Sequence, residues 1–355
     1  MEEIYTRLAA KLGRPDSECI AKIFEYAASP RQARILEALN QPPQPALTVE
    51  RLAEKLGLDA NEIQQDLEDL FRKGLVFPRN FQDRREWRFG KSPMQLHDAM
   101  ISGWRFHAEP EKLYQLWHAY NEKEGYRAYG ADYAAATAQL MRVIPAWEAV
   151  ADDPNLQPWE DWREILGEKQ LITVVDCPCR LEVRACDRPV EVCLDFDRTA
   201  EYDIASGHGR KLSYEEALDI MSNASRSGLV PNGVNTAEVS LMCNCCDDCC
   251  IDFQTLEHCD IPLDHHYAKS RYEAKIDQDI CDGCQNCVDN CNFDAITMVK
   301  LPGAKKLKAQ VDSEACYGCG CCFMVCEPKA ISLQCVRPVS HVPGVEDKGT
   351  AAGVS

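Results

Sequence analysis

The strongest constraint on this chain is a cysteine spacing that occurs twice near its C-terminus. Each copy has the form C-x2-C-x2-C-x3-C, within a chain of 355 residues that contains 21 cysteines. This close spacing lets three sulfur atoms of one loop converge on a single metal group, which is typical of thiolate-bound [4Fe–4S] clusters. Zinc, the main alternative besides disulfides, prefers paired C-x2-C knuckles to a triple run with a trailing cysteine. The two copies comprise Cys281, Cys284, Cys287 and Cys291, then Cys316, Cys319, Cys322 and Cys326.

The region of about residues 270–335 resembles the two-cluster bacterial-type ferredoxin domain, because that family has the same two runs. In the family, the fourth cysteine of each run binds the other cluster. The resemblance therefore implies one cluster on Cys281, Cys284, Cys287 and Cys326, and a second on Cys316, Cys319, Cys322 and Cys291. One departure is that Asn292 follows Cys291, and Glu327 precedes Pro328, where the family places proline directly after the fourth cysteine. Proline removes an N–H donor, so we expect the change to affect local hydrogen bonds and potentials but not ligation.

Length, charge and cysteine content indicate a cytoplasmic protein of several domains. The chain lacks an apolar run of about 18 residues and an N-terminal signal-peptide core. Cytosolic thiols stay reduced, so dense cysteine there indicates metal binding, and exposed clusters suggest an anaerobic host. A net charge of −18 argues against binding nucleic acid. It suits an electron carrier that docks on a positively charged patch of its partner.

The pattern of elements predicts a multidomain α+β fold. Three helices (Arg31–Leu39, Thr48–Leu56 and Asn61–Lys73) and two strands around a polar turn resemble a winged helix-turn-helix. The third helix, counted from Asp59, holds five acidic and two basic residues, which favours docking a protein over binding DNA. We predict a winged-helix-like domain (1–91), a helical aromatic-rich segment (92–165), a cysteine-rich α/β middle domain (166–268), a two-cluster ferredoxin domain (269–336) and a tail (337–355).

A second group of cysteines lies in the middle domain, on either side of a helix capped by Ser213 and Glu216. These residues are clustered, have polar neighbours and are expected on loops, unlike core cysteines. We expect one or two further iron–sulfur clusters, with zinc or a metal-free dithiol as alternatives. Arg180 is a candidate cofactor-binding residue because its charge offsets that of a thiolate-bound cluster. The candidate ligands are Cys177, Cys179, Cys186, Cys193, Cys243, Cys245, Cys246, Cys249 and Cys250.

Three histidines, His258, His265 and His266, lie between the two cysteine fields and are expected to be solvated loop residues rather than ligands. The remaining cysteines have no partner pattern, although Cys321 must lie near a cluster because it adjoins Cys322.

The layout of nearly the whole chain resembles large ferredoxin-type 4Fe-4S proteins of anaerobic bacteria and archaea. The matching motifs are Cys177-Pro-Cys-Arg180, Gly207-x-Gly-Arg210 and Cys243-Asn-Cys-Cys246. The resemblance implies further clusters without naming a substrate or a partner. We predict an electron-transfer protein whose redox partner is a flavoprotein or a reductase, with a homo-oligomer as a further expectation.

The sequence predicts no catalytic residue. It contains no G-x-G-x-x-G after a strand, no Walker A motif and no C-x2-C-H haem motif. We therefore predict an electron carrier, or an electron-transfer subunit of an oxidoreductase, that works at low potential. Two alternatives are a redox-sensing winged-helix transcription regulator and an iron–sulfur reductase with an atypical cluster in the middle domain.

Overall fold

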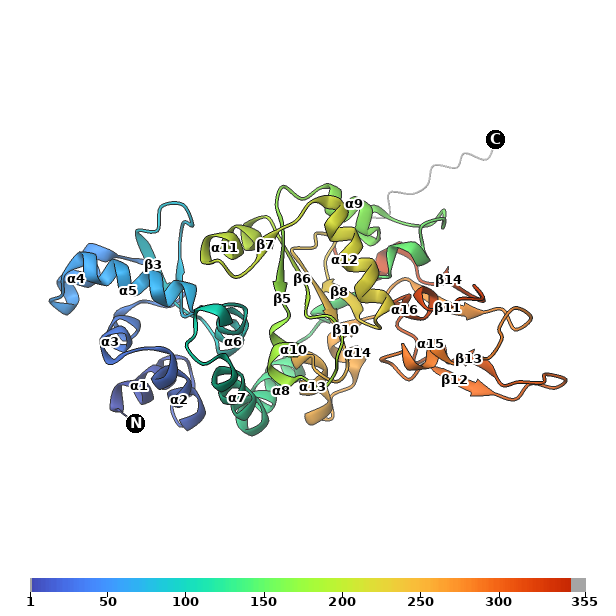
Figure 1. Ribbon diagram of the computed structural model, residues 1–355, viewed down its shortest axis with the longest axis horizontal. Coiled ribbons are helices and arrows are strands. Elements are labelled where there is room, and N and C mark those ends of the chain that lie inside the picture. Colours follow the sequence, from blue (N-terminus) through green and yellow to red (C-terminus); the bar gives the residue numbers. More distant parts are fainter. Residues whose placement is uncertain (1, 346–355) are drawn as a thin grey trace. The chain divides into compact units, whose positions relative to one another are not determined.

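The computed structural model describes residues 2–345 and divides them into two compact units (Figure 1). The first unit comprises the described part of residues 1–131 together with 173–191 and 198–211. The second comprises residues 132–172, 192–197 and the described part of 212–355. Both units mix helices and strands, which confirms the α+β prediction. The bounds of the five predicted segments stay predictions, and residues 346–355 of the predicted tail lie outside the described residues.

The first unit is mainly helical. Its α-helices are α1 (Glu3–Lys11), α2 (Glu18–Ala27), α3 (Pro30–Ala38), α4 (Val49–Leu56), α5 (Ala60–Arg72), α6 (Pro93–Ser102), α7 (Pro110–Tyr120), α10 (Pro178–Val183), α11 (Arg198–Ser206) and α8 (Tyr126–Ala135), along which the chain enters the second unit. A 3-10 turn, η1 (Trp104–Phe106), and a π-helical turn, η2 (Asn121–Gly125), lie between them. Its strands are β1 (Leu47–Thr48), β2 (Val76–Pro78), β3 (Glu86–Phe89), β5 (Ile172–Asp176) and β7 (Arg210–Lys211).

Local capping explains the bounds of the helices near the N-terminus. The Thr48 side chain accepts a hydrogen bond from Arg51 N at 3.2 Å, and α4 ends at Gly57 in the left-handed conformation. The Asp59 side chain caps α5 in the same way. The predicted helices and the two predicted strands are confirmed to within one or two residues. A third strand, β1, was not predicted; it pairs with β3, giving a sheet in the order β1-β3-β2.

A buried ion pair fixes α10, the helix that carries Cys179 and Arg180. Glu182 Oε2 lies 2.5 Å from His97 Nε2, and the Asn121 side chain donates to the same carboxylate at 3.1 Å. Both members of the pair are buried. Burial alone lowers the pKa of His97, but the charges of Glu182 and Asp98 raise it to about 10. Burial raises the pKa of Glu182, but His97 and its other partners hold it at about 2. The pair is therefore charged, and it holds α10 against α6 and α7.

We expect Glu182→Gln to destabilise the protein by about 3–5 kcal/mol near neutral pH, because His97 would keep a buried positive charge without its partner. The contribution of His97 to the free energy of unfolding is fully present below the ordinary pKa of 6.5, and it is lost as the pH rises through about 10. That of Glu182 is full above 4.5 and is lost as the pH falls through about 2. Urea unfolding at several pH values measures the effect.

The control for this prediction is Glu111→Gln, since Glu111 forms an exposed ion pair with Arg184 at 2.8 Å. Exposed pairs contribute about 0–1 kcal/mol. An equal loss of stability in the two variants would contradict the role assigned to the buried pair.

The second unit combines five neighbouring strands of a sheet with two smaller, two-stranded sheets. The five strands have the order β10-β4-β8-β9-β6, and β10 and β4 are their parallel pair. The two smaller sheets pair β11 with β14 and β12 with β13, both antiparallel (Figure 1). The strands are β4 (Met141–Val143), β6 (Glu191–Phe196), β8 (Val230–Val234), β9 (Leu241–Cys245), β10 (Tyr267–Ala268), β11 (Tyr272–Ile276), β12 (Ile296–Val299), β13 (Lys308–Val311) and β14 (Ile331–Cys335).

Helices cover this sheet and separate the cysteine runs. The α-helices are α9 (Trp162–Gly167), α12 (Tyr214–Arg226), α13 (Ile251–His258), α14 (Leu263–His266), α15 (Asn286–Asp289) and α16 (Cys321–Met324), and the 3-10 turns are η3 (Trp147–Ala149), η4 (Pro158–Glu160) and η5 (Val339–His341). The predicted capping box of Ser213 and Glu216 begins α12, which packs against β8, β9 and α16. No helix within residues 2–345 has the length and apolar character that a membrane span requires.

Candidate metal centres

The two C-x2-C-x2-C runs fold in the same way. Each forms a loop with a glycine of positive φ, Gly283 or Gly318, and then a four-residue helix, α15 or α16. A Cβ atom on Gly283 would lie 2.2 Å from Leu307 O, and one on Gly318 would lie 2.1 Å from Tyr272 O. Only glycine has both the conformation and the space for these positions. The two loops therefore pack closely against the backbone of Leu307 and of Tyr272, and these contacts hold the cysteines of the loops in place.

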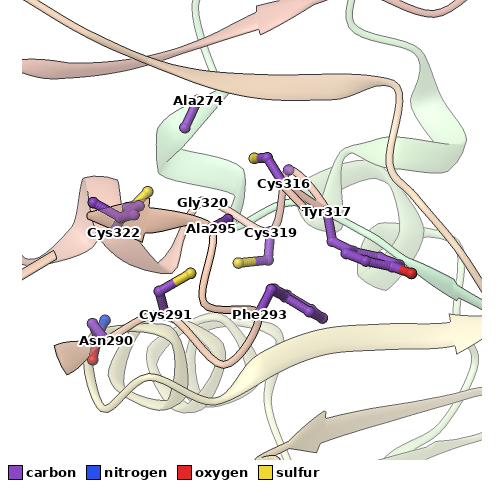
Figure 2. Close-up of a pocket in the computed structure, with 12 residues that line it drawn as sticks. Ala274, Asn290, Cys291, Phe293, Ala295, Cys316, Tyr317, Cys319, Gly320 and Cys322 are labelled. Atoms are coloured by element: carbon purple, nitrogen blue, oxygen red, sulfur yellow. The ribbon is translucent and has the colours of Figure 1, made fainter. Parts of the chain in front are cut away.

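One cavity is lined by Cys316, Cys319 and Cys322 from the second run and by Cys291 from the first. Figure 2 shows their sulfur atoms directed toward a common space. Phe293 and Tyr317 lie at one side of it with their rings stacked 4.4 Å apart. The other lining residues are mainly small or apolar, such as Ala274 and Ile296. We call this space the inner cavity.

A second cavity repeats the arrangement with the runs exchanged. Three of its thiols, Cys281, Cys284 and Cys287, come from the first run, and Cys326 comes from the second. Cys284 is exposed, whereas Cys281 and Cys287 are buried. We call this space the outer cavity. The cavities group the eight cysteines as the ferredoxin resemblance implied, and ligation by each thiol stays a prediction.

The donors in both cavities suit an iron–sulfur cluster. Soft thiolates in an otherwise apolar pocket select Fe–S clusters or zinc, and each cavity offers four of them. Burial raises the pKa of Cys287 and of Cys291 to about 11, so metal binding at neutral pH must release their protons. The backbone N–H groups of Phe293 and Ala295 act in the opposite direction on Cys291, and Ala330 N donates to Cys326 Sγ at 3.2 Å. Such bonds stabilise thiolates and tune reduction potentials.

Cys321, which was expected near a cluster, lies directly behind the inner cavity. It is fully buried, and its thiol reaches Leu229 O at 3.4 Å. Its hydrogen bond to Cys319 lowers the pKa of the Cys319 thiol. Cys321 therefore supports a candidate ligand and does not line the cavity itself.

Two such cavities in one small region define an iron–sulfur domain of ferredoxin type. The comparison with protein families gives the same result, because residues 280–330 match the family described as 4Fe-4S dicluster domain. The chain thus has a ferredoxin-type domain for two [4Fe–4S] clusters near its C-terminus, which implies a general role in iron–sulfur electron transfer. No curated protein and no solved structure matched the chain. The wider resemblance of the whole chain stays a prediction.

The first four middle cysteines, from Cys177 to Cys193, are divided between the two units. Cys177 precedes α10, Cys179 lies within it and Cys186 lies in the loop that follows, all in the first unit. Cys193 lies in the second unit, on β6. Arg180 is buried and donates to Pro189 O at 2.7 Å, so its backbone contact holds the loop that contains Cys186. Its predicted role at a cofactor stays a prediction.

The remaining middle cysteines, from Cys243 to Cys250, lie wholly in the second unit. The expectation that the middle cysteines are loop-borne was wrong for four of them: Cys179, which lies in α10, and three cysteines that lie on strands. Cys193 lies on β6, and Cys243 and Cys245 lie on β9. Sequence reasoning counted these thiols as ligands and so overlooked their place in alternating apolar strands.

Beyond β9, Cys246, Asp248 and Cys249 form a group that could hold a metal ion, with their ligand atoms within 4.8 Å of one another. Both cysteines are buried. Asp248 was not predicted, although its position directly before Cys249 was the available signal. The cysteine-rich middle therefore contains a candidate metal site besides the two dicluster cavities.

The expectation of solvated loop histidines was wrong in two respects: all three histidines lie in helices, and His266 is buried. It is buried at the end of α14, its ring lies 4.1 Å from that of Tyr133, and its Nε2 atom lies 3.6 Å from Asp252. His258 lies in α13, where its ring contacts Gln254 O at 2.9 Å. The neighbours of His266 are distant in sequence, so its burial was not visible in the local pattern.

The departure at Asn292 has a structural explanation. Its side chain donates to Gly228 O at 2.6 Å and accepts from Asp247 N at 3.3 Å. Proline could make neither bond. Asn292 thereby joins the run that ends at Cys291 to the loop that holds Cys246 and Cys249.

Proposed function

We propose that the chain is an electron-transfer protein that passes low-potential electrons through its two dicluster sites and one or two further middle-domain clusters to a redox partner. The observation that supports this proposal most is the pair of matched four-thiol cavities in one small domain. When bound, cubane clusters supply one-electron redox chemistry. Four thiolates per cluster and an acidic chain favour the low end of the potential range, since both disfavour adding an electron.

Contacts within the second unit support the further step to the middle domain. The Asn292 side chain accepts from Asp247 N, between Cys246 and Asp248 of the candidate middle site. It also follows Cys291, which lines the inner cavity. One hydrogen bond therefore links the segment that contains Cys291 to the loop that contains Cys246, which supports a middle centre near the inner cavity.

The partner proposed for the outer cavity is an acidic flavoprotein or small acidic redox protein. The turn between β12 and β13 carries exposed Lys305 and Lys306, and residues 295–311 contain no acidic residue. Leu307, whose carbonyl faces Gly283, is itself exposed. Although the chain is acidic and exposed Asp282 lies close to Cys284 in the sequence, the β12–β13 turn itself is basic and partly apolar, which fits an acidic partner.

For the N-terminal part we propose a winged-helix-like domain that docks a protein. Helices α3, α4 and α5 with the sheet β1-β3-β2 support that assignment. Three arginines around the turn between β2 and β3 have acidic neighbours: Arg79 pairs with Glu86, Arg84 with Glu68 and Arg85 with Asp83, at 2.8–3.3 Å. Because these acidic neighbours partly neutralise the arginines, less positive charge is available to bind DNA phosphates. This favours the electron carrier over the transcription regulator.

The test of the proposed function is metal analysis with redox titration. Protein purified and reconstituted without oxygen should hold about twelve to sixteen irons with matching acid-labile sulfide, because each [4Fe–4S] cluster contributes four. An EPR-monitored titration should find clusters with midpoints below roughly −200 mV. About eight irons and no other metal would rule out middle centres, and midpoints all above that threshold would rule out a low-potential carrier.

A further inference from the structure

The geometry points to a separate thiolate metal site in the second unit, formed by Cys193, Cys243, Cys245 and Cys250 and distinct from the group of Cys246, Asp248 and Cys249. This inference rests on the proposed function, because it assigns ligands to one of two middle centres. The run Cys243-Asn-Cys-Cys-Asp-Asp-Cys-Cys250 then serves two sites instead of one.

Strand geometry places three of the four thiols on one face of the sheet. Side chains alternate along a strand, so Cys243 and Cys245 share a face of β9, opposite to Met242 and Asn244. On β6, Cys193 alternates with the buried Val192 and Leu194.

The register of the two strands brings Cys193 toward Cys243. Leu194 pairs with Met242, so extending the register by one residue places Cys193 across from Cys243. One step further, the Asn244 side chain donates to Val192 O at 2.7 Å, which ties the strands together beside the two thiols.

The fourth thiol comes from the N-terminus of α13. Cys250 Sγ lies 3.4 Å from Cys245 Sγ, and both residues are buried. The Cys245 thiol also forms side-chain hydrogen bonds with both Cys243 and Cys250. Buried thiols crowded in this way gain most from a metal that takes up their charge.

The intervening residues of the run belong to the other group. Cys246 and Cys249 have their sulfur atoms within 4.8 Å of each other and of a carboxylate oxygen of Asp248. The turn that contains them is closed by the bond from Cys250 N to Cys246 O at 3.1 Å. Strand β9 and the start of α13 thus supply Cys243, Cys245 and Cys250 to the four-thiol site. The turn between them supplies Cys246 and Cys249 to the other group.

The four-thiol site shares an apolar core with the inner cavity. Cys245 and Cys250 pack in one buried cluster with Tyr317 and Cys319, both of which line that cavity. A series of rings leads the same way: Tyr267, whose hydroxyl lies 3.9 Å from Cys250 Sγ, contacts Phe253, and Phe253 contacts Phe293 of the cavity wall. This placement suits a redox centre, so the metal group assigned is an iron–sulfur cluster, and zinc is the other thiophilic choice.

The test compares two double variants of the full chain, Cys245→Ser/Cys250→Ser and Cys246→Ser/Cys249→Ser, with the quadruple variant and the natural sequence. Iron, zinc and acid-labile sulfide per chain are measured after anaerobic reconstitution, and EPR follows the dicluster signals. Each double variant should lose only the metal of its own site, about four irons for a cluster, and the quadruple variant should lose the sum. Cys193→Ser should reproduce the loss seen with Cys245→Ser/Cys250→Ser.

The dicluster signals report folding, so loss of middle metal with those signals intact cannot come from a misfolded second unit. A single shared site would be shown by two double variants that each remove the same metal, with no further loss in the quadruple variant. Zinc in place of iron at the four-thiol site would overturn its assignment as a cluster. Natural protein with about eight irons and no zinc would instead overturn the proposed middle centres themselves.

Discussion

Replacing Gly318 by alanine is expected to remove the metal of the inner cavity, about four of the eight irons of the dicluster domain. Gly318 has φ +68°, and an added Cβ atom would lie 2.1 Å from Tyr272 O and 2.3 Å from Ser270 Oγ. Ser270 donates to Gly318 O and accepts from Tyr272 N, so β11 cannot shift without losing these bonds. The loop between Cys316 and Cys319 must therefore move, and two thiols of the cavity move with it.

The matched control is Gly303→Ala in the β12–β13 turn. Gly303 has φ +81°, but a Cβ atom there would meet nothing within 4 Å. Both variants carry the cost of a left-handed residue, about 1–2 kcal/mol, whereas only Gly318→Ala adds a clash with the backbone. Iron analysis and EPR should show a loss in Gly318→Ala alone. Equal iron in the two variants would mean that the tight loop is not needed to position the thiols.

The sequence predicts this domain well because its chemistry is local. Three thiols of each cavity lie within seven residues, so the spacing alone groups Cys281, Cys284 and Cys287. Helix bounds were also predictable, since Thr48 and Asp59 cap helices through bonds to their near neighbours. The spacing by itself does not show that the fourth cysteine of each run belongs to the other cavity. The resemblance to the ferredoxin family implied that assignment.

The middle of the chain was less predictable because its sites depend on contacts between distant segments. Cys193 and Cys243 are 50 positions apart in the sequence, and the strands that carry them, β6 and β9, pair with each other. His266 is buried through Tyr133, a residue far earlier in the chain. Strands β6 and β9 were also predicted to be loops. Their cysteines were treated as metal ligands and were left out of the alternating pattern that indicates a strand. Each failure follows from treating a long-range arrangement as a local one.

The basic turn between β12 and β13 is expected to control the rate of electron transfer with an acidic partner. We expect Lys305→Glu/Lys306→Glu to slow electron transfer with an acidic one-electron carrier, for instance a flavodoxin, by about 10–100-fold at low ionic strength. The turn is joined to the cluster loop, since Lys308 donates to Gln278 O at 2.9 Å and also to Cys281 O. A partner that approaches exposed Cys284 therefore meets these lysines, and reversing their charge replaces attraction by repulsion.

Stopped-flow measurement of the second-order rate constant at about 20 mM and about 500 mM salt separates this effect from other causes, because salt screens attraction between exposed charges. At high salt the variant and the natural protein should differ by no more than about twofold. The control variant Lys22→Glu/Lys112→Glu changes the net charge equally but at exposed positions on α2 and α7 of the first unit. If it slowed the reaction as much, the net charge of the chain would govern docking, and the turn would have no special role. A slow rate confined to the Lys305/Lys306 variant, with unchanged iron content, would place the entry of electrons at the outer cavity.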